Sequence, residues 1–351
     1  MVQRKAFGAA LAGLALFLAL VTEIAFAQTP IASSKHNLSA TGPGTIKAAA
    51  GGTSEICVFC HTPHSATTSM VTPLWNTQLT AAAYTLYSSD YLTGLGYPTP
   101  VLGATQSSRT CLSCHDGTVA LGSVVNTPGS GTTGSIPMAG GITTMPAGNT
   151  NLGTILADDH PVGFLYLPGT GAGQDPELVS TRAFPWPKGV QLDPNQASVS
   201  GTPGSGGRVE CKSCHDPHNN QFTKFLRMSN TNAGLCTYCH NKTGYTGSVH
   251  QASGQTYTPV GGTATNVGEW SCRSCHKPHT SGGTPYVLRA AEEATCYDSG
   301  CHGTLNPLDG ATIRALTAGS NLIQPEMNKA RRHPTTLTTL NVSVEIGRAH
   351  V

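Results

Sequence analysis

Apolar residues are concentrated in one stretch near the start of the chain, AALAGLALFLALV, from Ala9 to Val21. The basic residues Arg4 and Lys5 precede this stretch, and the small-x-small sequence Ala25–Ala27 follows it, as at a signal-peptide cleavage site. The stretch is short for a membrane span and Glu23 interrupts its end, so we favour a signal peptide over a membrane anchor. We therefore expect an exported mature chain, in the periplasm or at the cell surface.

Beyond the first stretch, hydrophobic and polar positions alternate with little regular period. Short helical pieces are expected at Thr80–Tyr87 and Leu288–Cys296, and loops at Asn126–Asn151 and Ser198–Gly207. No later segment is long and apolar enough to cross a bilayer. The pattern favours a mostly irregular fold with short α-helices and little sheet.

The composition sharpens this picture. The 351 residues include 41 Gly and 23 Pro, and only 6% of residues are aromatic. A domain of this length usually buries a large aliphatic core, which this chain is poorly supplied to build. We therefore expect something other than side chains to fill much of the interior.

All twelve cysteines occur in pairs that end in Cys-His, which disulfide pairing would not require. Five pairs have two residues between the thiols and one has four. The attachment cysteines are Cys57, Cys60, Cys111, Cys114, Cys211, Cys214, Cys236, Cys239, Cys272, Cys275, Cys296 and Cys301.

Two thiols on one helical turn can bond the two vinyl groups of a haem, and the adjacent histidine can then bind the iron. Zinc knuckles and redox dithiols are the alternatives, but zinc needs four ligands and has no rule that histidine follows the second cysteine. The motifs therefore predict six covalent haem c groups, including one at the longer motif Cys296–His302. The porphyrins would be the missing core of a multihaem cytochrome c.

The haem motifs recur in three similar units. The first motif of each unit carries an extra histidine in Cys-His-x-Pro-His, whereas the second motif lacks it. Each unit also has one histidine upstream and a glutamate shortly before its first motif, namely Glu55, Glu210 or Glu269.

The repeat supplies as many further histidines as there are haems. The proximal ligands are His61, His115, His215, His240, His276 and His302, and the expected distal ligands are His36, His64, His160, His218, His250 and His279. Ordinary surface histidines are the alternative for any one of these six. Methionine ligation is less favoured because the methionines occupy no repeated position.

The two histidines of Cys-His-x-Pro-His cannot easily bind one iron, because axial ligands approach from opposite faces. We expect His64, His218 and His279 each to reach a neighbouring haem. One short peptide would then hold two haems close together.

The sequence resembles the doubled-CXXCH multihaem cytochromes c of respiring bacteria, through CVFCHTPH, PLWN at Pro73–Asn76 and CLSCHDGTVAL at Cys111–Leu121. The resemblance implies bis-histidine low-spin haems, low reduction potentials and extracytoplasmic electron transfer. Some proteins of this kind stack their haems into extracellular filaments, so a homopolymer is among the expected partners.

The charge of the chain gives no support for a nucleic-acid role, because there is no basic stripe interleaved with aromatic residues. The formal charge is +2, and ionised haem propionates would bring the mature holoprotein to about −11. The favoured function is an electron carrier or conduit serving redox partner proteins or extracellular acceptors. A multihaem reductase with one five-coordinate haem is the alternative.

The end of the sequence contains a further echo of the repeat, because RRHPT around His333 matches DDHPV around His160. We expect His333 to begin a fourth unit whose motifs the sequence lacks, and Glu345–Val351 to be translated sequencing adapter. A genuine tail in which His333 binds a haem is the alternative. The expected divisions are 1–27 (signal peptide), 28–157, 158–247 and 248–310 (dihaem units), 311–344 (tail) and 345–351 (artefact).

Overall fold

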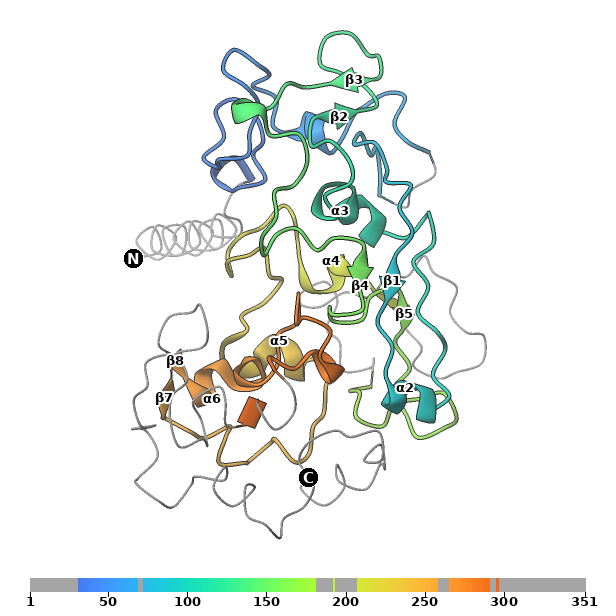
Figure 1. Cartoon of the computed structure of the whole chain (residues 1–351), viewed down its shortest axis with the longest axis vertical. Coiled ribbons are helices and arrows are strands. Elements are labelled where there is room, and N and C mark those ends of the chain that lie inside the picture. Colours follow the sequence, from blue (N-terminus) through green and yellow to red (C-terminus); the bar gives the residue numbers. More distant parts are fainter. Residues whose placement is uncertain are drawn as a thin grey trace, which may run out of the picture.

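The computed structural model describes residues 31–68, 72–180, 192, 207–257, 265–290 and 295–296 (Figure 1). The expected signal peptide, the thiol and histidine of Cys301-His302, and the tail from 303 onward with His333 lie outside the described residues.

The helices are short. The α-helices are α2 (Asp90–Gly94), α3 (Ser108–His115), α4 (Cys211–Cys214), α5 (Gly234–Thr237) and α6 (Val267–Trp270). The 3-10 helices are η1 (Ile31–Ser33), η2 (Cys57–Phe59), η3 (Ala139–Gly141), η5 (Thr231–Ala233), η6 (Ser271–Ser274) and η7 (Pro285–Val287). Five of these helices, α3, α4, α5, η2 and η6, contain residues of a Cys-x-x-Cys sequence.

The strands form four separate two-stranded ladders among the described residues. The strands are β1 (Thr85–Leu86), β2 (Ser123–Val124), β3 (Gly134–Ser135), β4 (Ile155–Leu156), β5 (Phe164–Leu165), β6 (Arg208–Val209), β7 (Thr256–Tyr257) and β8 (Thr265–Asn266). The pair β1–β4 is parallel, whereas β2–β3, β5–β6 and β7–β8 are antiparallel. Such short ladders fix loops rather than form a layer.

Apolar packing is divided among small clusters. One gathers around Phe59 and Val124, a second around Tyr166 and Val209, and a third around Leu112. Many fully buried side chains are polar, including Asn76 and Ser113. The described residues therefore hold little aliphatic core, as the composition indicates. A haem-filled interior remains a prediction.

Two expected elements are wrong or incomplete. The segment Thr80–Tyr87 is extended rather than helical, because its end pairs with β4 and Tyr84 and Leu86 pack on the Leu112 cluster. Leu288 forms an isolated β-bridge with His276 instead of starting a helix, and residues 291–294 lie outside the described residues. The expected loop Asn126–Asn151 contains β3 and η3, and of the expected loop Ser198–Gly207 only Gly207 is described.

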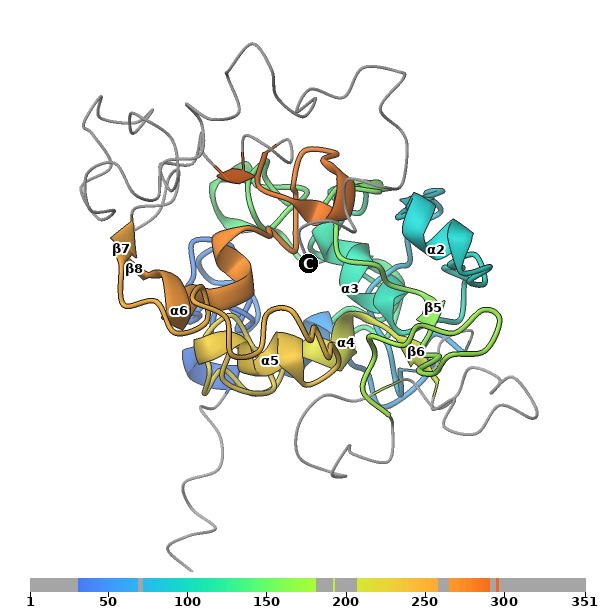
Figure 2. The same cartoon turned by 90° about the horizontal axis from the view of Figure 1, so that it is seen from below.

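The motif-bearing helices follow the long direction of the molecule, with α3 and α4 above α5 and α6 (Figure 1). Viewed along that direction, these four helices are distributed around the axis, and α2 lies further out (Figure 2). No helix in the described part of the chain is both long and apolar enough to span a membrane.

Candidate functional site

Each described Cys-x-x-Cys-His motif closes a single helical turn. In four motifs the backbone N–H of the histidine donates to the carbonyl of the first cysteine, over 2.8–3.0 Å: His61 to Cys57, His215 to Cys211, His240 to Cys236 and His276 to Cys272. The remaining motif, Cys111–His115, lies within α3. This turn places both thiols and the histidine at one end of the same short element.

The first motif of each unit is followed by a loop that returns to its histidine. His61, His215 and His276 form isolated β-bridges with Trp75, Leu226 and Leu288. Two residues before each bridging residue, a carbonyl lies 2.9–3.0 Å from the histidine Nδ1: that of Pro73, Lys224 and Tyr286. The three loops therefore fix the rings in the same way.

Eight histidine rings face one another in four pairs. The ring centroids are 6.2 Å apart for His36 and His115, 6.1 Å for His61 and His218, 6.1 Å for His160 and His240, and 6.2 Å for His215 and His279. Each pair joins one expected proximal ligand to one expected distal ligand.

This spacing fits one metal ion between two imidazoles. A histidine nitrogen binds a metal at about 2 Å and lies about 1 Å from its own ring centre, so two rings on opposite sides of a metal have centroids about 6 Å apart. The rings are too far apart to be in direct van der Waals stacking, and their interplanar angles range from 23° to 73°. The residues therefore fit a haem iron held between two histidines.

The protonation of these rings favours the same arrangement. Burial lowers the pKa of His36 and His160 to about 4 and that of His240 to about 3, so the rings are neutral at pH 7. A backbone carbonyl also accepts from Nδ1 of His115 at 2.7 Å. A neutral imidazole whose Nδ1 carries the proton keeps its Nε2 lone pair for a metal.

Among the described residues, the thiols are neither joined in disulfides nor gathered in a zinc-type cluster. Burial raises the pKa of Cys60 and Cys214 to about 11, so these thiols are protonated in the apo-chain. No disulfide joins the described cysteines, and within the described ranges no three histidine, cysteine or acidic side chains converge as a metal cluster. This argues against the zinc alternative, which needs four converging ligands.

Consecutive motifs adjoin through their cysteines. Within the first unit, Cys60 is close enough to raise the pKa of Cys114 electrostatically, and in the second unit Cys214 has the same effect on Cys239, in both cases after burial as the larger cause. Between units the contacts are closer, because the side chains of Cys111 and Cys211 share a hydrogen bond, as do those of Cys236 and Cys272. The contacts between units connect first cysteines, whereas those within a unit connect second cysteines. The five described motifs thus form a line in sequence order.

The extra histidines of the second and third units each reach the first motif of the preceding unit. His218 faces His61 rather than His215, and His279 faces His215 rather than His276. The Cys-His-x-Pro-His peptides therefore bring each extra histidine to a different motif from their own, in the direction of the N-terminus.

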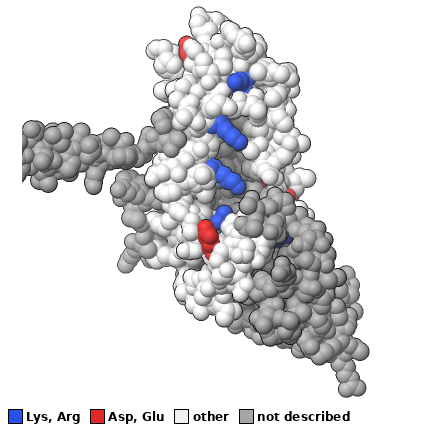
Figure 3. All heavy atoms as spheres, turned by 90° about the vertical axis from the view of Figure 1, so that its left-hand side faces the viewer, with Lys and Arg blue, Asp and Glu red and all other residues white. Residues whose placement is uncertain are grey.

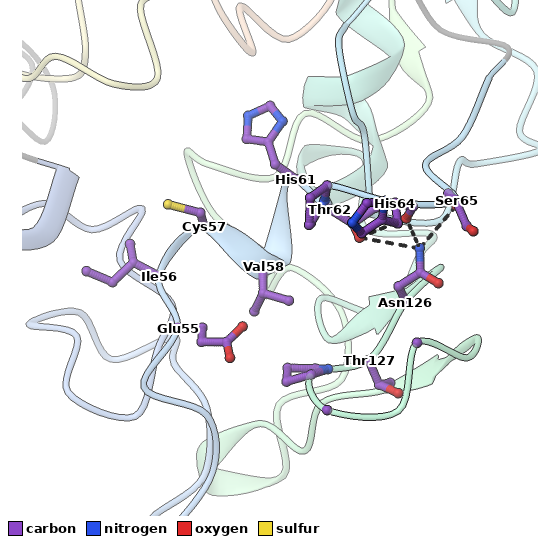
Figure 4. Close-up of a pocket in the computed structure, with 14 residues that line it drawn as sticks. Glu55, Ile56, Cys57, Val58, His61, Thr62, His64, Ser65, Asn126 and Thr127 are labelled. Carbon is purple, nitrogen blue, oxygen red and sulfur yellow. Dashed lines mark hydrogen bonds between the residues drawn. The ribbon is translucent and has the colours of Figure 1, made fainter.

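His64 and His276 complete no such pair among the described residues. His64 is exposed and lines a pocket of about 710 Å³ that also includes Cys57 and His61. Figure 4 shows the His61 ring and the Cys57 thiol on one side of the loop and His64 beside Asn126 on the other. His250 is exposed, and the expected proximal ligand His302 lies outside the described residues.

Sequence reasoning missed several supporting residues. Phe225 stacks on the His36 ring at 4.1 Å, and Asp159 accepts from the Nδ1 of His279 at 3.0 Å. The buried Asn76 links the first motif to the loop at Asn126. Asn76 ends the PLWN sequence, and Phe225 begins an FLR sequence that resembles VLR at Val287, so both had a sequence signal. No motif marks the contact of Asp159.

Charged side chains are unevenly spread over the surface. On the face shown in Figure 3, lysine and arginine side chains form a row along the long direction of the molecule, and acidic side chains are few. This is the direction in which the motifs follow one another (Figure 1).

Comparison with known families supports the haem motifs. Residues 203–245 and 265–306 match the family model for the doubled CXXCH motif, whereas the motifs at Cys57 and Cys111 lie outside the matched segments. No curated protein matched the chain. The matched segments carry the haem-attachment motif of c-type cytochromes, whose general roles are haem c binding and electron transfer. Domains with this motif are typically extracytoplasmic.

Proposed function

We propose that this protein transfers electrons outside the cytoplasm through six covalently bound, bis-histidine haems c, as a carrier or as a conduit. The observation that carries the proposal is the set of four histidine pairs with centroids 6.1–6.2 Å apart, each beside an attachment motif. When bound, haem c supplies an iron that takes up and releases one electron. The exported location rests on the N-terminal sequence pattern.

The order of the motifs supports a conduit. Electron hopping requires redox centres held at short, fixed distances, and cysteines of consecutive motifs lie near one another from the first unit into the third, with hydrogen bonds at the two boundaries between units. The peptides that carry His218 and His279 also join neighbouring units, because His218 faces His61 and His279 faces His215. The chain itself thereby sets both the sequence and the spacing of the centres.

The haem count tests the proposal directly. Intact mass and a pyridine haemochrome assay on the exported protein should give six haems per chain, and the oxidised protein should be low-spin. Five haems with free thiols at Cys296 and Cys301 would show that the longer motif does not attach haem.

One observation favours the reductase as a second candidate. Among the described residues, no histidine ring is paired with that of His276 at the fifth attachment site. A five-coordinate iron there could bind a substrate. Carbon monoxide binding by the reduced monomer that persists at every protein concentration would favour this function.

A homopolymer would close the same position. In the repeated pattern, the extra histidine of one unit faces the first motif of the preceding unit, as His218 faces His61. His64 begins this series and His276 ends it among the described residues, so the two are complementary. We propose that His64 of one copy faces His276 of another, in addition to contacts with redox partner proteins or extracellular acceptors.

A further inference from the structure

The expected ligand histidines differ in the group that accepts from their Nδ1 atoms. For six of them a backbone carbonyl accepts from Nδ1, at distances between 2.7 and 3.3 Å. The pairs of histidine and carbonyl are His36 and Pro217, His61 and Pro73, His115 and Thr150, His160 and Pro161, His215 and Lys224, and His276 and Tyr286. His279 is different, because the carboxylate of Asp159 accepts from its Nδ1 at 3.0 Å. His218 also has a carboxylate nearby, but Asp216 lies 3.6 Å from its Nδ1, beyond hydrogen-bond distance.

Asp159 is built into this position. The residue is only 3% exposed, and the same oxygen that contacts His279 also accepts from the backbone N–H of Thr280 at 3.2 Å. Its other oxygen, Oδ2, is buried and makes no hydrogen bond within the described residues. The carboxylate charge is therefore directed at His279 rather than shared among several donors.

The neighbouring backbone fixes both sides of the contact. The carbonyl of Asp158 accepts from the backbone N–H and from the hydroxyl of Ser281, each at 2.9 Å, and His160 donates its backbone N–H to the carbonyl of Pro278 at 2.7 Å. Hydrogen bonds thus join residues 158–160, at the start of the second unit, to residues 278–281, the peptide that carries His279. These bonds hold the backbone of Asp159 beside the peptide that carries His279.

A carboxylate acceptor changes a metal-bound imidazole more than a neutral carbonyl does. It draws the Nδ1 proton toward itself, which raises the electron-donating strength of the ring at Nε2 and stabilises the oxidised metal. The site that His279 shares with His215 is the one at the third motif.

We propose that Asp159 is a positioning residue that lowers the reduction potential of the third attachment site relative to the other described histidine pairs, in which no carboxylate lies within hydrogen-bond distance of a ring nitrogen. This inference rests on the proposed haem binding. It makes the third site the strongest reductant among the described sites with a histidine pair. Electrons crossing from the first unit to the third would have to pass it.

The sequence restricts this device to the second unit. The residue that precedes the upstream histidine is Asp159 before His160, but Lys35 before His36 and Val249 before His250. The units are otherwise similar in their motifs, so the other two provide natural comparisons. The difference is one of charge: negative, positive and neutral.

Spectroelectrochemical titration of the holoprotein tests the proposal. In Asp159→Asn, the reduction equilibrium constant of one haem should rise about tenfold, an upward shift of about 59 mV for a one-electron couple, while the ferric spectrum stays low-spin. Asp159→Glu should restore most of the wild-type potential. The matched control is Asp158→Asn, which removes the same charge one residue away from a side chain that contacts Gly282 rather than a histidine. It should shift no haem by more than about twofold.

Equal shifts in the two Asn variants, or no shift in either, would overturn the inference and leave haem binding intact, whereas a chain without haem would defeat the proposed function itself. If Asp159→Asn loses a low-spin haem, its potential cannot be compared, and the proposal is tested on the wild-type protein instead. Near-infrared magnetic circular dichroism of the ferric wild type should resolve one bis-histidine haem apart from the others. A single coincident band for all of them would refute the role of Asp159.

Discussion

Single residues in unfavourable backbone conformations direct the ligand histidines. Leu74, Phe225 and Val287 have φ angles of 57°, 58° and 51°, in the left-handed region that non-glycine residues rarely adopt. Each lies between the carbonyl that accepts from a proximal histidine and the residue that bridges to it. Strain of this kind persists only where surrounding contacts impose it, which is why it collects at functional sites.

Leu74 allows the strain to be measured, because its side chain is 51% exposed and contributes little packing. Leu74→Gly should raise the free energy of unfolding by about 0.5–1 kcal/mol, since glycine adopts positive φ without a Cβ clash. Denaturant titration of the holoprotein measures this change. Val101→Gly is the matched control, with the same 51% exposure but no positive φ, and should lose about 0.5–1 kcal/mol. A loss in both variants would contradict the argument.

Asn76 joins three loops around the first motif. Its Nδ2 donates to the carbonyls of Val58 at 2.6 Å and Asn126 at 3.0 Å, and its Oδ1 accepts from the backbone N–H of Asn126 at 2.8 Å. Asn76→Ala should lower the free energy of unfolding by about 3 kcal/mol, because the buried carbonyls and N–H lose their partner. Thermal unfolding monitored by circular dichroism would show this. The exposed Asn149→Ala should change it by less than about 0.5 kcal/mol.

At the scale of elements, the sequence predicted local features well and long-range ones poorly. The one-turn motifs and the extra histidines that reach away from their own motif follow from spacing alone. The extended segment at Thr80–Tyr87 did not, because its pairing with β4 depends on residues about 70 positions later. Nor could spacing decide that His218 belongs opposite His61, since the two lie in different units and meet only through tertiary packing.

His218→Ala tests the reach between units. We expect the mutation to open the haem at the first motif, not the one attached at Cys211 and Cys214, because the His218 ring faces His61. The reduced variant should bind one additional equivalent of carbon monoxide per chain. Replacing Cys57 and Cys60 by serine in the His218→Ala background should abolish this extra binding.

The corresponding replacement of Cys211 and Cys214 serves as the control and should leave that carbon monoxide site in place. The opposite result would mean that the extra histidine serves the haem of its own motif. His218→Met, which keeps an axial ligand, should bind less carbon monoxide than His218→Ala.

At the scale of the whole molecule, the five described motifs follow one another along its length (Figure 1). The six-fold repeat of Cys-His pairs predicted the number of centres but not their order, because sequence adjacency does not impose spatial adjacency. The order emerges from cysteine contacts that alternate between the second cysteines within a unit and the first cysteines between units. In this order, His64 in the first unit and His276 in the third are left without a paired histidine ring among the described residues.

His64→Ala should separate assembly from haem binding. The monomer of this variant should keep the wild-type haem content and spectrum, because no described histidine ring faces His64. In the wild type, carbon monoxide binding should fall as protein concentration rises and copies associate, whereas in His64→Ala it should stay constant. Analytical ultracentrifugation of the same samples measures association. If His333→Ala rather than His64→Ala exposes the site, the tail supplies the ligand instead.

The pairing of His61 with His218 and of His215 with His279 also has a consequence in time. On the proposed function, the chain is exported from its N-terminus, so the position opposite His61 would stay open until the second unit has emerged, and that opposite His215 until the third has. Each unit is closed by its successor. Proteolytic loss of one unit would therefore remove the second histidine from a site in the preceding unit, and a haem bound there would lose one axial ligand.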